Sequence, residues 1–275
     1  MQHSNRNGVE RTVVIEGDLR EAILLYSPHC ANMTTGTVLS NNESRVIRVG
    51  ENIAVKFGEE VVPEEAEALK FVKSSTSIPV PEVFGVLKRG KVCYIVLEYI
   101  AGRTLTDIWP TLSVESKNNI SKKLKGCFED LNGISGKYIG GIGFKGSLDP
   151  LFDEVEKGPF ESEEAMRKQI GAALEKVDYP NFARFAPMML STGNSIVFCH
   201  GDISPDNIKV SDDQILAVIG WKYAGFYPEQ WEFSNAMWNC LEVLRGSDWV
   251  DYVPTIVKPD YIHYAKMFTI REALL

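Results

Sequence analysis

The sequence predicts an α+β protein of two lobes, a small lobe rich in β-strands followed by a larger, mainly helical lobe. Three observations support this prediction. Apolar residues alternate over residues 45–57 and 82–98, as they do in antiparallel hairpins. Beyond these segments, apolar residues recur at helical spacing. The 275 residues, 44% of them hydrophobic, suffice to bury a core in each lobe. We place the lobes at residues 1–98 and 99–275.

The small lobe is predicted to contain two hairpins and one helix. Residues 50–52, Gly-Glu-Asn, form the turn of the first hairpin, and residues 88–91 form the turn of the second. Pro63 is followed by two glutamates. This pattern favours a helix start, because negatively charged side chains are stabilised near the positive, N-terminal end of the helix dipole. Pro79 ends that segment. Residues 32–44 hold a single Gly and are predicted to be a polar loop.

The large lobe is predicted to be mostly helical. Ser113 can cap a helix, and the apolar stripe of that helix consists of Val114, Ile120, Leu124, Phe128 and Leu131. A Gly-rich loop follows over residues 133–146, and residues 161–177 form another helix. Two strand-like runs, residues 195–198 and 215–219, come next. The last helices begin near Pro228 and Tyr261.

Charge and cysteine content exclude several classes of protein. The net charge is −8, and such a chain is repelled by nucleic acids and anionic membranes unless it carries a local basic stripe. The densest basic run, residues 117–125, is interpreted as the solvated face of a helix. Residues 1–20 lack an apolar signal region, and no later segment is long enough to span a bilayer, so a cytoplasmic location is expected. The five scattered cysteines contain no Cys-x-x-Cys pair, which favours reduced thiols.

Residues 198–210 carry the strongest functional signal. They place His200, Asp202 and Asn207 between two apolar runs, at the spacing of a kinase catalytic loop. In kinase chemistry the Asp orients the acceptor hydroxyl and takes its proton, while the Asn five residues later is a ligand of the nucleotide-bound Mg²⁺. The next apolar run should deliver a carboxylate for the metal, yet Gly220 stands there.

With these features the chain resembles the aminoglycoside phosphotransferase and choline kinase-like family, especially its fungal members. The resemblance implies a bilobal, protein-kinase-like fold, with ATP as the cofactor and a small hydroxylated molecule as the acceptor. The motifs that carry it, besides the catalytic loop, are Ala54-Val55-Lys56-Phe57-Gly58, Glu65-Ala66-Glu67-Ala68, Thr76-Ser77-Ile78-Pro79-Val80-Pro81, Leu97-Glu98-Tyr99-Ile100-Ala101-Gly102 and Trp221-Lys222-Tyr223-Ala224-Gly225-Phe226-Tyr227-Pro228.

The resemblance assigns roles in nucleotide binding. It implies a phosphate-covering loop at residues 32–44, with a plain polar loop as the alternative. Lys56 is implied to contact the phosphates, and the acid that holds it is Glu65 in preference to Glu67. The backbone groups of Glu98 and Tyr99 are implied to face the adenine edge. In the catalytic loop, Asp202 is the expected general base or orienting group, with an Asx turn as its structural alternative. His200 is a candidate proton carrier, although we favour a structural role that holds the loop.

The residues predicted to bind metal depart from the family pattern. Asn207 is the expected ligand, but Gly220 replaces the main metal-binding Asp, and Lys222 stands where relatives commonly carry Glu. A hard cation such as Mg²⁺ needs oxygen ligands, usually carboxylates, so the pattern argues against a strong Mg²⁺ site. Asp206 could supply a replacement carboxylate, or Lys222 could act as a fixed cation on the phosphates.

Three functions remain open from the sequence. The first is ATP-dependent phosphorylation of a hydroxyl group on a small molecule. The second, favoured by Gly220 and Lys222, is a metal- and ATP-independent step on a biosynthetic intermediate that uses Asp202 and His200. The third is a non-catalytic, pseudokinase-like binding protein. A protein kinase is disfavoured because no room for an activation segment follows Gly220. The sequence leaves the acceptor and the oligomeric state undetermined.

Overall fold

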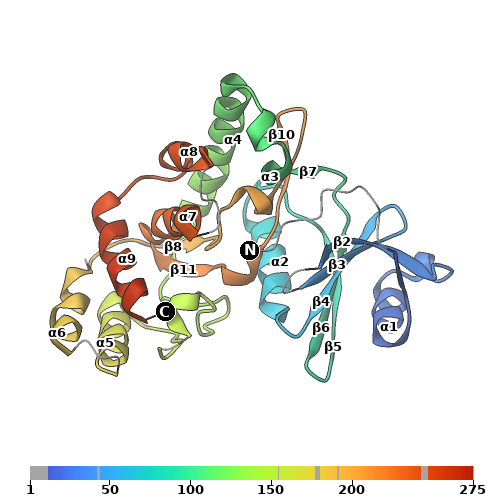
Figure 1. Ribbon diagram of the computed structural model, residues 1–275. Coiled ribbons are helices and arrows are strands. Elements are labelled where there is room, and N and C mark those ends of the chain that lie inside the picture. The colour runs from blue at the N-terminus through green and yellow to red at the C-terminus, as the bar shows by residue number, and fades with distance from the viewer. Residues whose placement is uncertain are drawn as a thin grey trace. The chain divides into compact units, whose positions relative to one another are not determined.

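The computed structural model describes residues 12–41, 44–153, 155–176, 180–190, 192–242 and 247–274. The chain divides into two compact units. The first comprises the residues up to Ala66 together with Pro81–Ala101, and the second comprises Glu67–Val80 and Gly102–Leu275. The first unit is rich in strands and the second is mainly helical, so the predicted α+β class is confirmed (Figure 1). The division into lobes at residues 1–98 and 99–275 stays a prediction.

The first unit is built on a six-stranded antiparallel sheet with the order β1-β2-β3-β4-β6-β5. Its strands are β1 (Thr12–Val14), β2 (Thr35–Asn41), β3 (Arg45–Val49), β4 (Ile53–Gly58), β5 (Val83–Arg89) and β6 (Val92–Glu98). Both predicted hairpins, β3–β4 and β5–β6, are confirmed. Gly50 and Gly90 adopt φ angles of 64° and 56° at their turns, a conformation that glycine takes without steric cost.

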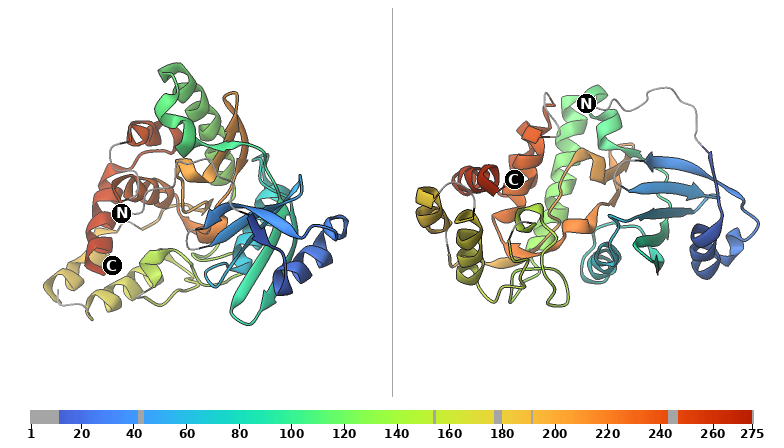
Figure 2. Two further views of the ribbon diagram at one scale, coloured as in Figure 1. Left: turned by 45° about the vertical axis from the view of Figure 1, so that its right-hand side comes forward. Right: turned by 60° about the horizontal axis from the view of Figure 1, so that its bottom comes forward.

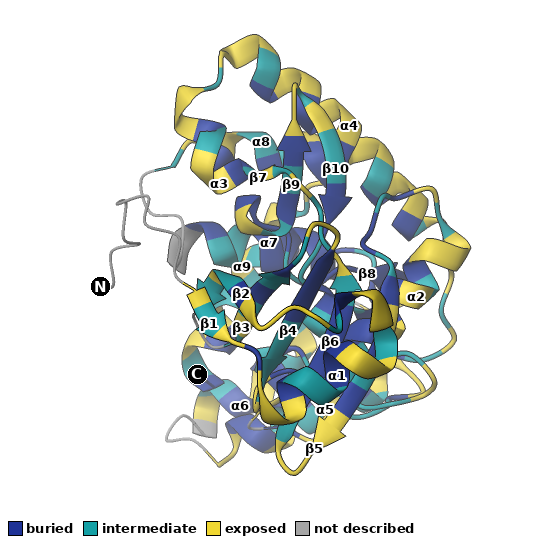
Figure 3. Ribbon diagram, turned by 90° about the vertical axis from the view of Figure 1, so that its right-hand side faces the viewer, coloured by how far each residue is buried: buried dark blue, intermediate teal, exposed yellow. Residues whose placement is uncertain are grey.

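The helix α1 (Gly17–Tyr26) covers one face of this sheet, where it packs against β5 and β6. Leu19 and Ile23 from α1 share a core with Ile53 and Val55 of β4. The central strands β4 and β6 are accordingly the most buried part of the sheet, and α1 is exposed along its outer side (Figure 3). Because side chains alternate along a strand, the residue after Val55, Lys56, projects from the opposite face.

Residues 35–41 correct the prediction of a loop over residues 32–44. They form β2, which pairs with β1 on one side and with β3 on the other. The pairing partners lie elsewhere in the chain, and a polar Thr- and Ser-bearing segment can form a strand when both of its edges are hydrogen-bonded. Residues 42 and 43 lie outside the described residues.

The second unit contains most of the helices. The helix α2 (Pro63–Ser75) begins in the first unit and ends in the second, and it starts at Pro63 as predicted. The remaining elements are β7 (Arg103–Thr104), α3 (Leu105–Ile108), α4 (Val114–Asn132), α5 (Glu163–Leu174), α6 (Pro180–Met189), β8 (Ile196–Cys199), β9 (Ile208–Ser211), β10 (Gln214–Val218), β11 (Gly225–Pro228), α7 (Trp231–Glu242), α8 (Trp249–Ile256) and α9 (Tyr261–Leu274), with short 3₁₀ turns η1 to η5 at Pro28–Cys30, Trp109–Thr111, Pro150–Phe152, Pro205–Asn207 and Trp221–Tyr223.

The helix α4 tests the predicted cap and stripe directly. The Ser113 hydroxyl accepts a hydrogen bond from the Ser116 N–H at 3.1 Å, which confirms the cap. Ile120 and Leu124 are fully buried, whereas Val114 is 68% exposed and was wrongly placed on the apolar stripe. Val114 is the first residue of the helix, so its side chain lies beyond the packed turns. The predicted helix over residues 161–177 corresponds to α5; Val177 lies outside the described residues.

Two short sheets and the helix α7 flank the segment with the catalytic-loop spacing. β8 pairs with β11, while β9 lies between β10 and β7. The helix α7 packs against α8 and α9 (Figure 2), and Trp231 of α7 lies in the core with Ile170 of α5 and Ile270 of α9. The loop between β8 and β9 is therefore attached to buried strands at both ends.

All five cysteines are free thiols, and four of them are buried. The reduced state that the sequence favours stays a prediction. Among the residues that the structure describes, no helix combines the length and the apolar character that crossing a membrane requires.

Candidate active site

Asp202 lies in the loop between β8 and β9, and the structure brings it together with Asn207. The Asn207 Nδ2 donates hydrogen bonds to the carbonyl oxygen of Asp202 at 2.9 Å and to its carboxylate Oδ2 at 2.8 Å. The other carboxylate oxygen, Oδ1, accepts from Nδ2 of Asn239 on α7 at 2.8 Å. Asp202 itself is half-buried. The five-residue spacing thus produces a carboxylate that is held on both oxygens by amide donors.

Gly201 is the residue that allows this loop to turn. Its φ angle is 83°, and a Cβ atom there would lie 2.6 Å from the carbonyl oxygen of Tyr223. Every other residue would meet both the backbone strain and this contact, since only glycine lacks a Cβ. The loop therefore packs tightly against the η5 turn that follows β10.

His200 is a structural residue of the loop in this geometry. It is fully buried, its Nδ1 accepts from the Asp202 N–H at 3.1 Å, and its Nε2 lies 2.9 Å from the Ile219 carbonyl oxygen. The Nδ1 contact requires an acceptor, which assigns the ring proton to Nε2. Burial lowers the pKa of His200 to about 4, so the ring is neutral near pH 7. With both nitrogens engaged, the geometry favours the structural role over that of a proton carrier.

Asn207 occupies the space in front of Gly220. A Cβ atom at Gly220 would lie 2.3 Å from Oδ1 and 2.4 Å from Cγ of Asn207. Gly220 also has φ 79° and ψ 42°, the left-handed conformation that glycine adopts most readily. The two residues are held in place by the Ile219 N–H, which donates to the Asn207 carbonyl oxygen at 2.8 Å. The side chain of Asn207 therefore fits only because position 220 lacks a side chain.

Asp206 and Lys222 are the two charged residues proposed from the sequence as substitutes for the missing acid. Asp206 is exposed on the η4 turn, next to Asn207 in the chain. Lys222 is half-buried in η5, and its Nζ lies 5.4 Å from the centre of the Tyr223 ring, within the range of a cation–π contact. Their roles toward phosphate or metal stay predictions.

In the first unit, the structure places Glu65 rather than Glu67 against Lys56. The Lys56 Nζ lies 2.8 Å from Oε1 and 2.7 Å from Oε2 of Glu65. Glu65 is only 3% exposed, and a buried carboxylate of this kind requires a partner cation. Glu67 instead pairs with Lys145 in the second unit. The phosphate-binding role of Lys56 remains a prediction.

The backbone of Glu98 and Tyr99 was predicted to face adenine. The Glu98 N–H donates to the Glu82 carbonyl oxygen at 2.9 Å, and the Tyr99 N–H donates to that of Asn52 at 2.8 Å. Both N–H groups are thus already used. A nucleobase contact at these two residues would have to rely on their carbonyl groups, which can accept but not donate.

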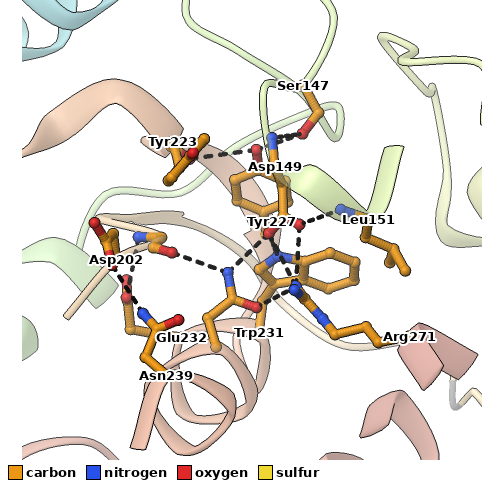
Figure 4. A network of polar contacts seen from close by, with 12 residues as sticks. Ser147, Asp149, Leu151, Asp202, Tyr223, Tyr227, Trp231, Glu232, Asn239 and Arg271 are labelled. Carbon is orange, nitrogen blue, oxygen red and sulfur yellow. Dashed lines mark hydrogen bonds and ion pairs between the residues drawn. The ribbon is translucent and has the colours of Figure 1, made fainter. Parts of the chain in front are cut away.

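Side chains on α7 form a buried polar network that supports the loop, and Figure 4 shows residues of this network as sticks. Two oxygens of Glu232 accept from the N–H groups of His200 at 2.5 Å and Gly201 at 3.0 Å. The Asn235 Nδ2 donates to the Gly201 carbonyl oxygen at 3.1 Å. Burial raises the pKa of Glu232 to about 7, although the two N–H bonds oppose that shift. The helix α7 therefore binds the backbone of the loop through side chains.

The deepest part of this network is an ion pair between Asp149 and Arg271. The Arg271 guanidinium lies 3.0 Å from Oδ1 of Asp149, and the exposed fractions of these residues are 3% and 1%. Arg271 also donates to the Asn235 Oδ1 at 2.6 Å, while Asp149 accepts from the Trp231 Nε1 at 2.8 Å. The last turns of α9 are thereby connected to α7 and, through Asn235, to the loop.

The model of the phosphotransferase enzyme family, APH, matches residues 37–255. The chain belongs to this family. The match includes β4, the loop between β8 and β9, and α7. Comparison with curated proteins gives no match.

Solved structures of aminoglycoside phosphotransferases share the fold. APH(4)-Ia superposes with a TM-score of 0.62 at 14% identity, covering 94% of this chain and 88% of that one. The streptomycin–ATP–APH(2")-IIa ternary complex gives 0.58 at 14%, covering 95% and 87%. ADP-bound APH(2'')-Ib gives 0.58 at 15%, covering 92% and 85%. These likenesses confirm the kinase-like fold that the sequence predicted for this member of the phosphotransferase family.

The residues of this phosphotransferase-family chain do not fit a resident Mg²⁺ ion. Gly220 offers no oxygen ligand, and Asn207 offers one neutral oxygen, Oδ1, because its Nδ2 is bonded to Asp202. Among the side chains that the structure describes, no three His, Cys, Asp or Glu residues gather as a metal-binding group. Mg²⁺ prefers several oxygen ligands, including one or two carboxylates. The Lys56–Glu65 pair, in contrast, fits a nucleotide phosphate.

Sequence reasoning missed the residues that support the loop, namely Asp149, Glu232, Asn235, Asn239 and Arg271. One signal was available. Over residues 231–242, α7 is predominantly apolar, yet Glu232, Asn235 and Asn239 recur at i, i+3 and i+7, which places three polar side chains on one face. A polar stripe on a buried helix requires hydrogen-bond partners. Asp149 and Arg271 gave no such signal, since their contact joins positions 122 residues apart.

Proposed function

We propose that this protein transfers the terminal phosphoryl group of ATP to a hydroxyl group of a small organic molecule. The observation that carries the proposal is the ion pair between Lys56 and Glu65, at 2.7 Å. Phosphotransferases with a kinase fold require this type of pair to position the lysine for the nucleotide phosphates. A nucleotide-independent enzyme has no need for such a pair.

The geometry of the pair suits a phosphate ligand. Glu65 is buried and fixes Lys56, while the Lys56 side chain keeps 19% of its surface exposed. An ammonium group has three N–H donors, so two bonds to Glu65 leave capacity for a phosphate oxygen. The strand position of Lys56, on the face opposite the α1 core, leaves it clear of that core. We therefore assign Lys56 to the nucleotide.

In the second unit, Asp202 is assigned to the acceptor. Its carboxylate is held by Asn207 and Asn239 and remains half-exposed, so lone pairs can accept a hydrogen bond from a hydroxyl group. Phosphoryl transfer passes through a loose transition state in which positioning contributes more than deprotonation. Asp202 would orient the hydroxyl and receive its proton late in the transfer.

The experiment measures phosphoryl transfer from labelled ATP to a panel of hydroxylated small molecules. The panel includes sugars, amino alcohols and the aminoglycosides named in the similar structures, streptomycin, gentamicin and hygromycin B. Transfer should fall at least about a hundredfold in Asp202→Asn and in Lys56→Met, as for loss of a group that positions reactants. Nucleotide binding is followed separately by calorimetry. Absence of both ATP binding and transfer in the native protein would refute the proposal.

The fit of Asn207 against Gly220 favours a second candidate function. Because a carboxylate is missing and Asn207 is turned toward Asp202, the loop suits an organic ligand better than a metal ion. The second candidate is therefore a metal- and ATP-independent conversion of a small biosynthetic intermediate, with Asp202 as the proton acceptor. An absolute requirement of the native activity for ATP would eliminate it, whereas turnover in the presence of a chelator and without nucleotide would establish it.

A further inference from the structure

The polar residues of α7 contact the loop in a regular order. Glu232 accepts from the N–H groups of His200 and Gly201, Asn235 donates to the Gly201 carbonyl oxygen, and Asn239 donates to the Asp202 carboxylate. These three residues, which we call the α7 polar stripe, lie on one face and extend over about 10 Å of helix at 1.5 Å per residue. Each successive turn of α7 therefore reaches further along the loop.

We infer that Asn239 is a positioning residue for Asp202. Its Nδ2 lies 2.8 Å from Oδ1, the oxygen that Asn207 does not contact. Asn207 comes from the loop itself, whereas Asn239 comes from the helix α7, whose Trp231 and Phe233 are fully buried. Two amide donors on different oxygens fix the plane of the carboxylate. Through this hydrogen bond, Asn239 fixes the orientation of the carboxylate relative to α7.

The magnitudes favour this role over simple packing. Asparagine is less favourable than alanine in a helix interior by roughly 0.5 kcal/mol. A hydrogen bond to a charged group contributes about 1.5–3 kcal/mol. The contact with Asp202 therefore outweighs the conformational cost of placing Asn239 in α7. The rest of the stripe keeps α7 in register, because Asn235 is bonded to Gly201 and, through its Oδ1, to Arg271.

The contact has a measurable consequence for Asp202. A hydrogen bond donated to the ionised form of a carboxyl group favours that form. Removal of the Asn239 donor should make the Asp202 carboxyl easier to protonate, and a carboxylate in place of the amide should do so more strongly through charge repulsion. The catalytic meaning of this effect rests on the proposed phosphoryl transfer, but the effect itself does not require ATP or an acceptor.

The experiment titrates the side-chain carboxyl carbons of aspartate-labelled protein by NMR. The Asp202 signal is assigned by its loss in Asp202→Asn. Relative to the native protein, Asn239→Ala should raise the pH midpoint of this signal by about 0.5–1 unit, and Asn239→Asp should raise it by more than about 1 unit. Asn119, exposed on α4, supplies the matched controls Asn119→Ala and Asn119→Asp, which should leave the signal unchanged.

Two outcomes decide the inference. If both Asn239 variants retain the native circular dichroism and the Asp202 midpoint does not move in either, the inference is overturned. If the pH midpoint of Asp202 moves as described, the inference stands. The nearly isosteric Asn239→Asp variant is sufficient for this test even if the alanine variant unfolds. A shifted midpoint without any phosphoryl transfer would reject only the proposed function. Where transfer is found, Asn239→Ala should lower kcat about tenfold, while KM for ATP stays unchanged.

Discussion

Substitution of Gly220 by alanine tests whether the empty position 220 is filled by Asn207. The added Cβ would lie 2.3 Å from Oδ1, 2.4 Å from Cγ and 2.7 Å from Nδ2 of Asn207. Atoms cannot remain at such distances, so the Asn207 side chain must rotate away. Rotation breaks both hydrogen bonds from its Nδ2 to Asp202. The alanine variant therefore perturbs the candidate active site without introducing any polar group.

The expected cost has two parts. An L-residue in the left-handed conformation at φ 79° costs about 1 kcal/mol. The bond to the ionised carboxylate contributes about 1.5–3 kcal/mol and the bond to the carbonyl oxygen about 0.5–1.5 kcal/mol, but water replaces part of both at this half-exposed site. We expect Gly220→Ala to lower the free energy of unfolding by about 3 kcal/mol, of which roughly two thirds comes from Asn207.

Urea denaturation measures this cost, and Gly90→Ala is the matched control. Gly90 has φ 56° in the β5–β6 turn, and nothing lies within 4 Å of its Cβ position, so its substitution reports the backbone strain alone. In an Asn207→Ala background, Gly220→Ala should cost only about as much as Gly90→Ala, because the contact is gone. If Gly220→Ala and Gly90→Ala destabilise the native protein equally, the Asn207 side chain does not lie against Gly220 and our reasoning fails.

Three further predictions concern buried charges. Because burial raises the pKa of Glu232 to about 7 from the ordinary 4.5, the folded protein holds a proton that the unfolded chain has lost between these pH values. The stability that protonated Glu232 contributes is therefore lost as the pH rises through about 7. Because glutamine does not titrate, the free energy of unfolding of Glu232→Gln should increase relative to that of the native protein by up to about 3 kcal/mol between pH 4.5 and 7.5, as measured by urea titrations. Arg271→Met should lower the free energy of unfolding by about 3–5 kcal/mol, since it leaves Asp149 buried and unpaired; an additional Asp149→Asn should recover part of the loss, and an unchanged melting temperature in the single variant would contradict the ion pair. Lys56→Met should cost about 3 kcal/mol for the same reason, with recovery when Glu65→Gln is added. Equal stability of the single and double variants in calorimetry would count against that pairing.

The sequence was informative wherever the determining interaction is local. The β3–β4 turn is set by Gly50, the start of α2 by Pro63 and its glutamates, and the start of α4 by the Ser113 cap. Each of these signals lies within a few residues of the feature it determines. The placement of Asp202 and Asn207 in one loop belongs to the same class, because only five positions separate them.

The features that were missed depend on contacts with other segments of the chain. The strand β2 was taken for a loop because its identity comes from pairing with β1 and β3 on both edges. The α7 polar stripe was overlooked because its partners belong to the loop some thirty residues earlier. The position of the Asn207 side chain depends on Gly220, which follows it by thirteen residues. The sequence shows that Gly220 replaces the expected acid. It does not show that the Asn207 side chain occupies the space that the acid would take.

The two candidate functions differ in what Asn207 can bind, and this difference follows from Gly220. Asn207 uses Nδ2 to hold Asp202, so its neutral Oδ1 is the one ligand atom that its side chain can offer. A single amide oxygen is a weak ligand for a hard divalent cation, whereas it readily accepts from an O–H or N–H group of an organic molecule. If ATP is used, a divalent cation must depend chiefly on phosphate oxygens, and its binding must disappear when the nucleotide is withheld. If ATP is not used, the same oxygen serves an organic ligand. Calorimetric titration of the protein with Mg²⁺ alone, with ATP alone and with the preformed Mg²⁺–ATP complex therefore separates the two functions before any acceptor has been found.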